Sequence, residues 1–310
     1  MKWNKKGLIC SHETLDLDWY TKNTMLPVPY LINDGILRIF ITMCDDNNAG
    51  RIGYIDVNPN NPSEILGYSK EPVLDIGEIG TFDDSGVVIS CIIEFQNKLL
   101  MYYSGYQLCV KTPYFIFANI AVANNANEKF VQIQRTPILD RTEAEMSIRS
   151  APFVIKDEKE YKMWYNADCD SVWKKNETGK LLPVYITKCI NSDNPYVWDQ
   201  KEGIKCFDFG DKNEYALSTP TLWYENGIYN MIYSIRTFDK GYRLGYAKSN
   251  DGFHFTRTDE EMDIDVSESG WDSEMMCFGS RYKFKDKTYL FYCGNNYGTE
   301  GFGYAELIKL

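Results

Sequence analysis

Acidic residues recur at matching positions along the chain, each shortly before a segment that is typical of a buried strand. Asp84, Glu145 and Glu274 stand five to seven residues ahead of the small residue or proline that opens such a segment. Two carboxyl groups that face one sugar suffice for glycoside chemistry, one as general acid and the other as nucleophile or base. Crowding of carboxylates raises the pKa of some of them, which suits a general acid. We therefore predict Asp84, Glu145 and Glu274 as catalytic residues.

Further charged and aromatic side chains stand near these acids or at matching positions, and we predict that they bind the substrate. Charged side chains hydrogen-bond sugar hydroxyls or hold an anionic group, and aromatic rings stack on sugars. The predicted substrate-binding residues are Asp45, Arg51, Arg141, Arg149, Glu214, Arg236, Trp271, Asp272 and Tyr297. Two other interpretations stay open. An acid before a strand can be a solvated turn residue, and Arg149 can pair with Glu145 instead of with a ligand.

Other kinds of catalytic site have little material in this sequence. Histidine occurs only as His12 and His254, which argues against Ser-His-Asp and Cys-His mechanisms. The nine cysteines are scattered singly, without C-x-x-C spacing, so neither a zinc site nor a disulfide framework is expected. We predict no cofactor and no metal site. Calcium, held by Asp and Glu oxygens in a central channel, is the one metal that we consider.

One pattern recurs five times: a small residue or proline, an apolar stretch, a polar turn, and then alternating aromatic and apolar residues. The copies start 59 to 68 residues apart. They begin at Pro29, Ser90, Pro152, Pro220 and Gly279. Each copy is typical of two antiparallel strands around a polar hairpin turn, for example at 33–35 or 157–159. A third strand follows in each copy, and "DNPYVWDQ" and "SNDGFHFTR" indicate a fourth, outer strand.

Four antiparallel strands repeated five times predict an all-β fold: a five-bladed β-propeller with four-stranded antiparallel blades, in a single domain over residues 1–310. A lone blade exposes two apolar faces, which its neighbours cover when the blades stack in a ring. The first strand of each blade then lines a central channel, so we expect the acids ahead of these strands to meet at its mouth. The segment "KGLIC" is expected to add an outer strand to the last blade. Two β-sandwiches are the competing fold, but they do not explain a fivefold repeat.

The overall charge and hydropathy limit the possible partners. A formal net charge of -11 repels phosphate backbones, so we predict no nucleic-acid partner. No apolar stretch approaches the length of a membrane span, and the first residues lack the apolar core of a signal peptide. We therefore predict no membrane span and a reducing, cytoplasmic location.

Several segments resemble those of known proteins. "GYAKSNDGFHFTR" and "YKMWY" resemble blade signatures of the five-bladed propeller glycosidase superfamily, which includes the arabinanase/xylosidase, invertase-like and mannoside-phosphorylase families. "FDDSGVVIS", "PVYITKC" and "GNNYGTEGFG" are more closely similar to an uncharacterised bacterial group associated with polysaccharide assembly. The resemblance spans nearly the whole chain and implies the fold more than the reaction. It singles out Asp84, Arg141, Glu145, Asp272, Glu274 and Tyr297.

The sequence departs from the arabinanase-type pattern at two signature acids. That pattern places an Asp directly before the proline of the first blade, where this chain has Val28. It also places a Glu two residues before the proline of a later blade, where this chain has Ser150. Either the carboxylates are relocated, or the propeller does something else with sugars.

These observations predict a carbohydrate-active enzyme that cleaves or transfers a glycosyl unit with carboxylates at the propeller mouth, in bacterial glycan metabolism. Its partner is a carbohydrate or an activated sugar, and hydrolysis, transfer and phosphorolysis all stay open. Phosphorolysis requires an anion pocket, for which Arg141, Arg149 and Arg236 are candidates. The alternative is a non-catalytic sugar-binding or scaffold propeller in a glycan-assembly complex.

Overall fold

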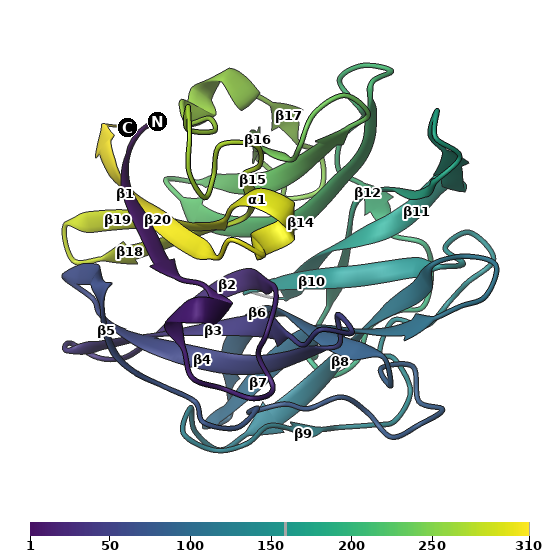
Figure 1. Ribbon diagram of the computed structural model, residues 1–310. Helices are drawn as coiled ribbons and strands as arrows, with labels where there is room; N and C mark the ends of the chain where they lie inside the picture. The colour runs from purple at the N-terminus through teal and green to yellow at the C-terminus, as the bar shows by residue number, and fades with distance from the viewer. Residues whose placement is uncertain (158–159, 310) are drawn as a thin grey trace.

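A computed structural model describes residues 1–157 and 160–309, and nearly all of their regular structure is β-strand (Figure 1). The exceptions are short: the 3-10 helices η1 (His12–Thr14) and η2 (Asp259–Met262), and the helix α1 (Asn295–Gly298). The predicted all-β class is confirmed. Within the described residues, no helix has the length and apolar character needed to cross a membrane.

The strands fall into five units, in each of which neighbouring strands pair antiparallel. The first unit contains β2 (Thr24–Asn33), β3 (Ile36–Cys44), β4 (Gly50–Asn58) and β5 (Asn61–Tyr68). The second contains β6 (Gly86–Phe95), β7 (Lys98–Leu108), β8 (Tyr114–Ala123) and β9 (Val131–Gln132). The third contains β10 (Ile148–Lys156), β11 (Tyr161–Lys175), β12 (Leu181–Ser192) and β13 (Ile204–Lys205).

The fourth unit contains β14 (Glu214–Glu225), β15 (Ile228–Thr237), β16 (Arg243–Ser249) and β17 (Thr256–Arg257). The fifth contains β18 (Cys277–Phe284), β19 (Lys287–Cys293), β20 (Phe302–Lys309) and the N-terminal strand β1 (Lys2–Cys10). β1 pairs antiparallel with β20, so the two ends of the chain lie side by side (Figure 1). The expectation that the first residues add an outer strand to the last unit is therefore confirmed.

Strand pairing joins only some of these units. The second, third and fourth units form one twelve-stranded sheet, because β8 pairs with β10 and β12 with β14 through short parallel bridges. The first and fifth units are separate four-stranded sheets. In the described part of the chain, no strand pairing links these two sheets to each other or to the larger one.

Side-chain packing, in contrast, follows a closed cycle. The first strands of the units contact one another in order: β2 contacts β6, β6 contacts β10, β10 contacts β14, β14 contacts β18, and β18 contacts β2. Apolar cores lie between successive units, as shown by Phe40 with Ile89 between the first and second. Another core joins the fifth unit to the first through Ile39 and Phe291. Each unit thus buries both of its apolar faces against two neighbours.

The polar hairpin turns lie where the sequence predicts them. β2 and β3 meet at Asn33, whose Oδ1 accepts a hydrogen bond of 2.9 Å from the backbone N–H of Gly35. Such a side-chain bond favours a tight turn over continued strand. The turn predicted at 157–159 includes Glu158 and Lys159, which lie outside the described residues.

Candidate functional site

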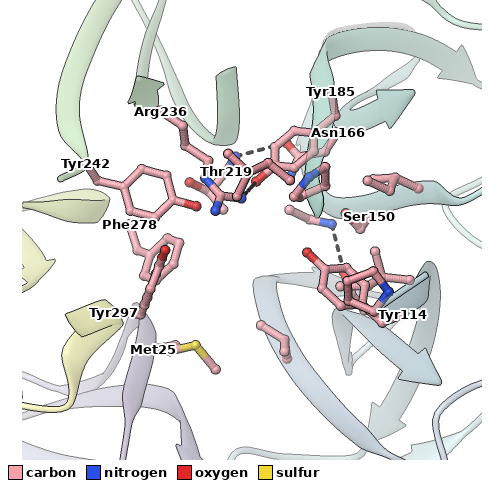
Figure 2. Close-up of a pocket in the computed structure, with 18 of the residues that line it drawn as sticks. Met25, Tyr114, Ser150, Asn166, Tyr185, Thr219, Arg236, Tyr242, Phe278 and Tyr297 are labelled. Carbon is pink, nitrogen blue, oxygen red and sulfur yellow. Dashed lines mark hydrogen bonds between the residues drawn. The ribbon is translucent and has the colours of Figure 1, made fainter. Parts of the chain in front are cut away.

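The first strands of the five units enclose a cavity of about 350 Å³, called the central cavity below (Figure 2). Each first strand contributes to its wall. The contributing residues are Met25 and Leu26 of β2, Val88 of β6, Ile148, Ser150 and Ala151 of β10, Thr219 of β14 and Phe278 of β18.

A β-bulge re-aims the first strand where it reaches the cavity. In the pairing of β10 with β11, the register shifts between Ser150 and Phe153, so that Ala151 has no partner on β11. Ala151 has a φ of 49°. Thr219, in the equivalent bulge of β14, also has a φ of 49°. Positive φ is costly for residues other than glycine, and such strain is concentrated at binding and active sites. In the first unit the bulge precedes Pro27, two residues before the repeat start that the sequence suggested.

Hydrogen bonds between units hold these bulges in place. The backbone N–H of each bulged or adjacent residue donates to a small polar side chain on the preceding unit's second strand. The bonds are Ile89 to Thr42 Oγ1 (3.0 Å), Ala151 to Ser104 Oγ (2.7 Å), Thr219 to Asn166 Oδ1 (2.9 Å) and Phe278 to Ser234 Oγ (3.0 Å). Leu26 of the first unit packs against the apolar core that contains Cys293 of the fifth, so the fifth unit also contacts the first.

Aromatic side chains from later strands form the rim of the cavity. They are Tyr114 at the start of β8, Trp173 of β11, Tyr185 of β12, Tyr242 just before β16, and Tyr297 of α1. The rings of Tyr114 and Trp173 meet edge-on with centroids 5.4 Å apart, and those of Tyr242 and Tyr297 with centroids 5.5 Å apart. Burial raises the pKa of Tyr114 and of Tyr242, so both hydroxyls are neutral hydrogen-bond donors at neutral pH.

Arg236 of the fourth unit places a cationic group among the aromatic side chains of this rim. Arg236 lies near the end of β15 and points into the cavity between Tyr185 and Tyr242 (Figure 2). Its Nη1 donates a hydrogen bond of 3.0 Å to Tyr185 Oη. The guanidinium carbon lies 5.0 Å from the ring centroid of Tyr215 and 4.9 Å from that of Tyr242. Among the described residues, no aspartate or glutamate forms an ion pair with Arg236.

The structure does not bring the three predicted catalytic carboxylates together in the central cavity. None of the described residues that line it is an aspartate or a glutamate. The expectation that Asp84, Glu145 and Glu274 share this hollow is therefore not met, and their catalytic role stays a prediction. The physical reason is that Glu145 is held in a buried ion network, and that Asp84 and Glu274 lie in loops outside the cavity wall.

Glu145 is fully buried in an ion network. Its Oε2 lies 2.6 Å from Arg149 Nε and its Oε1 lies 3.0 Å from Lys188 Nζ, with side-chain exposure of 0% for both Glu145 and Arg149. Tyr165 Oη donates to the same carboxylate at 3.0 Å. The pairing of Arg149 with Glu145, which the sequence left open, is thus observed. A carboxylate enclosed in this way has no free face for a substrate.

The other two carboxylates lie in loops. Asp84 accepts hydrogen bonds from the backbone N–H of Gly80 (2.9 Å) and from Ser85 Oγ (3.0 Å), as a turn-forming residue does. Glu274 is exposed, and its backbone N–H donates to Asn295 Oδ1 at 2.8 Å.

The predicted substrate-binding residues separate into several places. Asp45 pairs with Arg51 at 2.9 Å. Glu214 pairs with Arg257 at 2.7 Å, and Asp272 with Lys5 at 2.7 Å.

The remaining four predicted residues divide between the surface, the interior of one unit and the cavity. Arg141 lines a separate surface hollow, where its guanidinium lies 4.7 Å from the ring centroid of Phe115. Trp271 stacks on Tyr292 with centroids 5.0 Å apart. Arg236 and Tyr297 line the central cavity.

Sequence reasoning did not single out Tyr114, Tyr185 and Tyr242 as site residues. A usable signal exists in the order of the strands. In an antiparallel unit, the first and third strands begin at the same edge, and the second strand ends there. Aromatic residues at the start of the third strand, and Arg236 at the end of the second, therefore face the cavity that the first strands line. Within the described residues, no group of three or more His, Cys, Asp or Glu side chains is arranged to hold a metal ion.

Comparison with other proteins gives one clear relationship in sequence and several in structure. No family model matches the chain. The chain is 30% identical over 307 residues to the uncharacterized proteins MT1551 and Rv1502 of two Mycobacterium tuberculosis strains, with 99% of this chain and 99% of each relative covered.

Solved structures with the same fold include carbohydrate-processing enzymes. A protein named "Glycoside hydrolase" aligns with a TM-score of 0.69 at 16% identity, covering 98% of this chain and 90% of that protein. A thermostable family-43 glycoside hydrolase aligns with a TM-score of 0.69 at 13% identity, covering 92% and 88%. A GH43_1 enzyme from Xanthomonas citri, complexed with xylose, aligns with a TM-score of 0.64 at 13% identity, covering 97% and 89%. At these identities the likeness establishes the glycoside hydrolase-like fold.

Proposed function

The chain belongs to the same family as the Mycobacterium tuberculosis proteins MT1551 and Rv1502, and from this family and its glycoside hydrolase-like fold we propose that it is a carbohydrate-active protein whose ligand occupies the central cavity. The observation that carries the proposal is the cavity itself. Five bulged or adjacent first-strand segments meet there beneath a rim of aromatic rings.

The chemistry of the lining suits a sugar. Aromatic rings such as Trp173 and Tyr297 offer flat apolar faces for the C–H face of a pyranose or furanose ring. Tyr hydroxyls, Asn166 and Ser150 offer donors and acceptors for its hydroxyl groups. A mainly apolar pocket with a few convergent polar groups is the usual form of a small-molecule site.

We further infer that the five units are the blades of one five-bladed propeller over residues 1–310. Support comes from the cyclic contacts of the first strands and from the core that joins the first and fifth units. A crystal structure tests this inference. It is expected to show β18 packed against β2, and an open arrangement of the two end sheets would contradict it.

Cleavage or transfer of a glycosyl unit in bacterial glycan metabolism, on a carbohydrate or an activated sugar in the cytoplasm, is our first candidate for the reaction. Enzymes with this fold support it. The usual mechanism requires two carboxyl groups beside the scissile bond. Of the predicted Asp84, Glu145 and Glu274, we propose Asp84 and Glu274 for these roles, because Arg149 and Lys188 enclose Glu145. A non-catalytic sugar-binding or scaffold propeller is the second candidate. It is favoured by the lack of carboxylates among the described residues of the cavity wall.

Two measurements on the same samples separate these candidates. Binding of a panel of monosaccharides, sugar phosphates and nucleotide sugars is measured by calorimetry, and products are sought with the same panel and with aryl glycosides. The variants Asp84→Asn and Glu274→Gln are compared with the wild type. Turnover that falls at least 100-fold in either variant while binding stays supports the enzyme. Binding without products in the wild type supports the binding protein, and the lack of any sugar binding would contradict both.

A further inference from the structure

Arg236 carries a charge that no described carboxylate of the protein neutralises. Arginine stays protonated at every physiological pH. A charge that is withdrawn from water is costly unless an opposite charge or several hydrogen bonds replace the lost hydration. Within the part of the chain that the structure describes, the guanidinium of Arg236 donates one hydrogen bond, of 3.0 Å to Tyr185 Oη, and otherwise lies against aromatic rings.

Other buried or half-buried arginines show what is missing beside Arg236, which is itself half-buried. Each of them has a carboxylate partner. The pairs include Arg38 with Asp56 (2.8 Å), Arg149 with Glu145 (2.6 Å) and Arg257 with Glu214 (2.7 Å). Arg236 differs from this set, and it is also the arginine among them that lines the central cavity. The place that a carboxylate would take beside Arg236 therefore lies in the space open to a ligand.

The surroundings of Arg236 suit an anion. The described residues that line the cavity include no acidic side chain that would repel one, and Lys180 adds a second cation to the lining. Tyr242 and Tyr297 border the same space (Figure 2), and neutral tyrosine hydroxyls donate hydrogen bonds to carboxylate and phosphate oxygens. A guanidinium also presents paired N–H groups in the planar arrangement that matches two oxygens of such an anion.

We propose that the ligand of the central cavity is an acidic sugar, whose carboxylate or phosphate group accepts hydrogen bonds from Arg236. This inference rests on the proposed function, since it specifies the class of carbohydrate that the same cavity takes. The anionic group is held at the end of β15, between Tyr185 and Tyr242, and the sugar ring extends toward Tyr297 and Trp173.

The test compares neutral sugars with their acidic counterparts. Calorimetry measures the binding of glucose, glucuronate and glucose 6-phosphate, and of the same three forms of galactose, to the wild type and to Arg236→Gln. We expect at least one acidic form to bind tenfold or more tightly than its neutral parent. In Arg236→Gln that preference should be lost, while affinity for the neutral parent changes less than threefold. Preference for the uronate identifies a carboxylate, and preference for the phosphate ester identifies a phosphate.

Two further variants keep the test decisive. Arg135→Gln removes an exposed arginine that pairs with Glu78 and should leave every affinity unchanged. Arg236→Lys keeps the charge but not the paired N–H groups, and is expected to bind the acidic sugar with intermediate affinity. It replaces Arg236→Gln as the test variant if circular dichroism shows that the glutamine variant does not fold.

The outcomes separate this inference from the function on which it rests. Equal affinity for neutral and acidic sugars in the wild type would overturn the inference and leave a carbohydrate-binding function standing. A preference for acidic sugars that survives in Arg236→Gln would overturn it as well. Binding of inorganic phosphate with no binding of any sugar would contradict the proposed function while retaining Arg236 as an anion site.

Discussion

The hydroxyl of Tyr165 donates a hydrogen bond of 3.0 Å to the carboxylate of Glu145, which stands 20 residues earlier in the chain. The same relationship, with the same separation of 20 residues, occurs in two other units. There Tyr103 donates to Asp83 (3.0 Å) and Tyr292 donates to Asp272 (2.9 Å). In these three units, an acidic residue therefore recurs before the first strand because it accepts a hydrogen bond from a buried tyrosine of the second strand in the same unit.

The first and fourth units support this explanation. In the fourth, Tyr233 donates instead to Asp259 at 2.5 Å, and Arg257 links Asp259 to Glu214. In the first, the register of β2 with β3 places Ile41 where the other units have tyrosine. Ile41 has no hydroxyl, which accounts for the lack of an acid at the matching position of that unit.

Replacing Glu145 by Gln is expected to destabilise the protein strongly. The change leaves the buried guanidinium of Arg149 without its counter-charge, and breaking a buried pair from one side costs about 3–5 kcal/mol. The free energy of unfolding from urea titration measures this loss. Glu143→Gln, two residues away on the surface, is the control and should change stability by less than ~0.5 kcal/mol. A stable Glu145→Gln protein that lacks only turnover would instead support a catalytic Glu145.

Replacing Tyr292 by Phe removes one hydroxyl and leaves Asp272 with Lys5 as its remaining partner. A hydrogen bond to a charged group contributes about 1.5–3 kcal/mol, so a loss of that size in the free energy of unfolding is expected. Tyr224→Phe is the matched control, because Tyr224 is 55% exposed. Equal stability of the two variants would show that the recurring tyrosine–carboxylate bond has no structural role.

Asp168 predicts a pH dependence of stability. Burial raises the pKa of Asp168 from 3.8 to about 6, and its Oδ1 is enclosed without a hydrogen-bond partner among the described residues. Between these two pKa values the folded chain holds a proton that the unfolded chain has lost, so the contribution of Asp168 to stability falls as pH rises through that interval. Above the folded-state pKa of about 6, the free energy of unfolding is lower by the full amount, which is on the order of 2–3 kcal/mol.

The variant Asp168→Asn removes this dependence, since the amide does not titrate. The free energy of unfolding of Asp168→Asn, minus that of the wild type, is expected to rise between about pH 4 and pH 7 by on the order of 2–3 kcal/mol. Urea unfolding at several pH values measures the difference. Asp193→Asn, at an exposed position, should give a flat difference. A flat difference for Asp168→Asn as well would mean that Asp168 titrates as an ordinary carboxylate.

Most of the fold was predictable from the sequence because its signals are local. Alternating aromatic and apolar residues indicate strands, and short polar segments such as Asn33 to Gly35 mark hairpins wherever they occur. The fivefold spacing then predicts five such units. The pairing of β1 with β20 also followed, because an apolar segment at the start of the chain requires a sheet edge to cover it.

The site was less predictable because it depends on where side chains point. The bulges at Ala151 and Thr219, which turn the first strands toward the cavity, have no marker in the sequence beyond the proline that follows each. The recurrence of acids was visible, but sequence alone does not distinguish a carboxylate that faces a substrate from one that accepts a buried Tyr hydroxyl. Glu145 belongs to the second kind by its contacts.

Tyr297 provides a test of the aromatic rim that is independent of Arg236. Its side chain is 40% exposed and meets the ring of Tyr242 with centroids 5.5 Å apart, so it offers an accessible face for a sugar. Stacking of this kind contributes about 1 kcal/mol, and Tyr297→Ala should therefore weaken neutral and acidic sugars alike by about fivefold. Calorimetry with the panel used for Arg236 measures this, with Tyr224→Ala as the exposed control. Loss of affinity for acidic sugars alone would mean that Tyr297 acts through its hydroxyl on the anion, and unchanged affinities would place the sugar away from this side of the cavity.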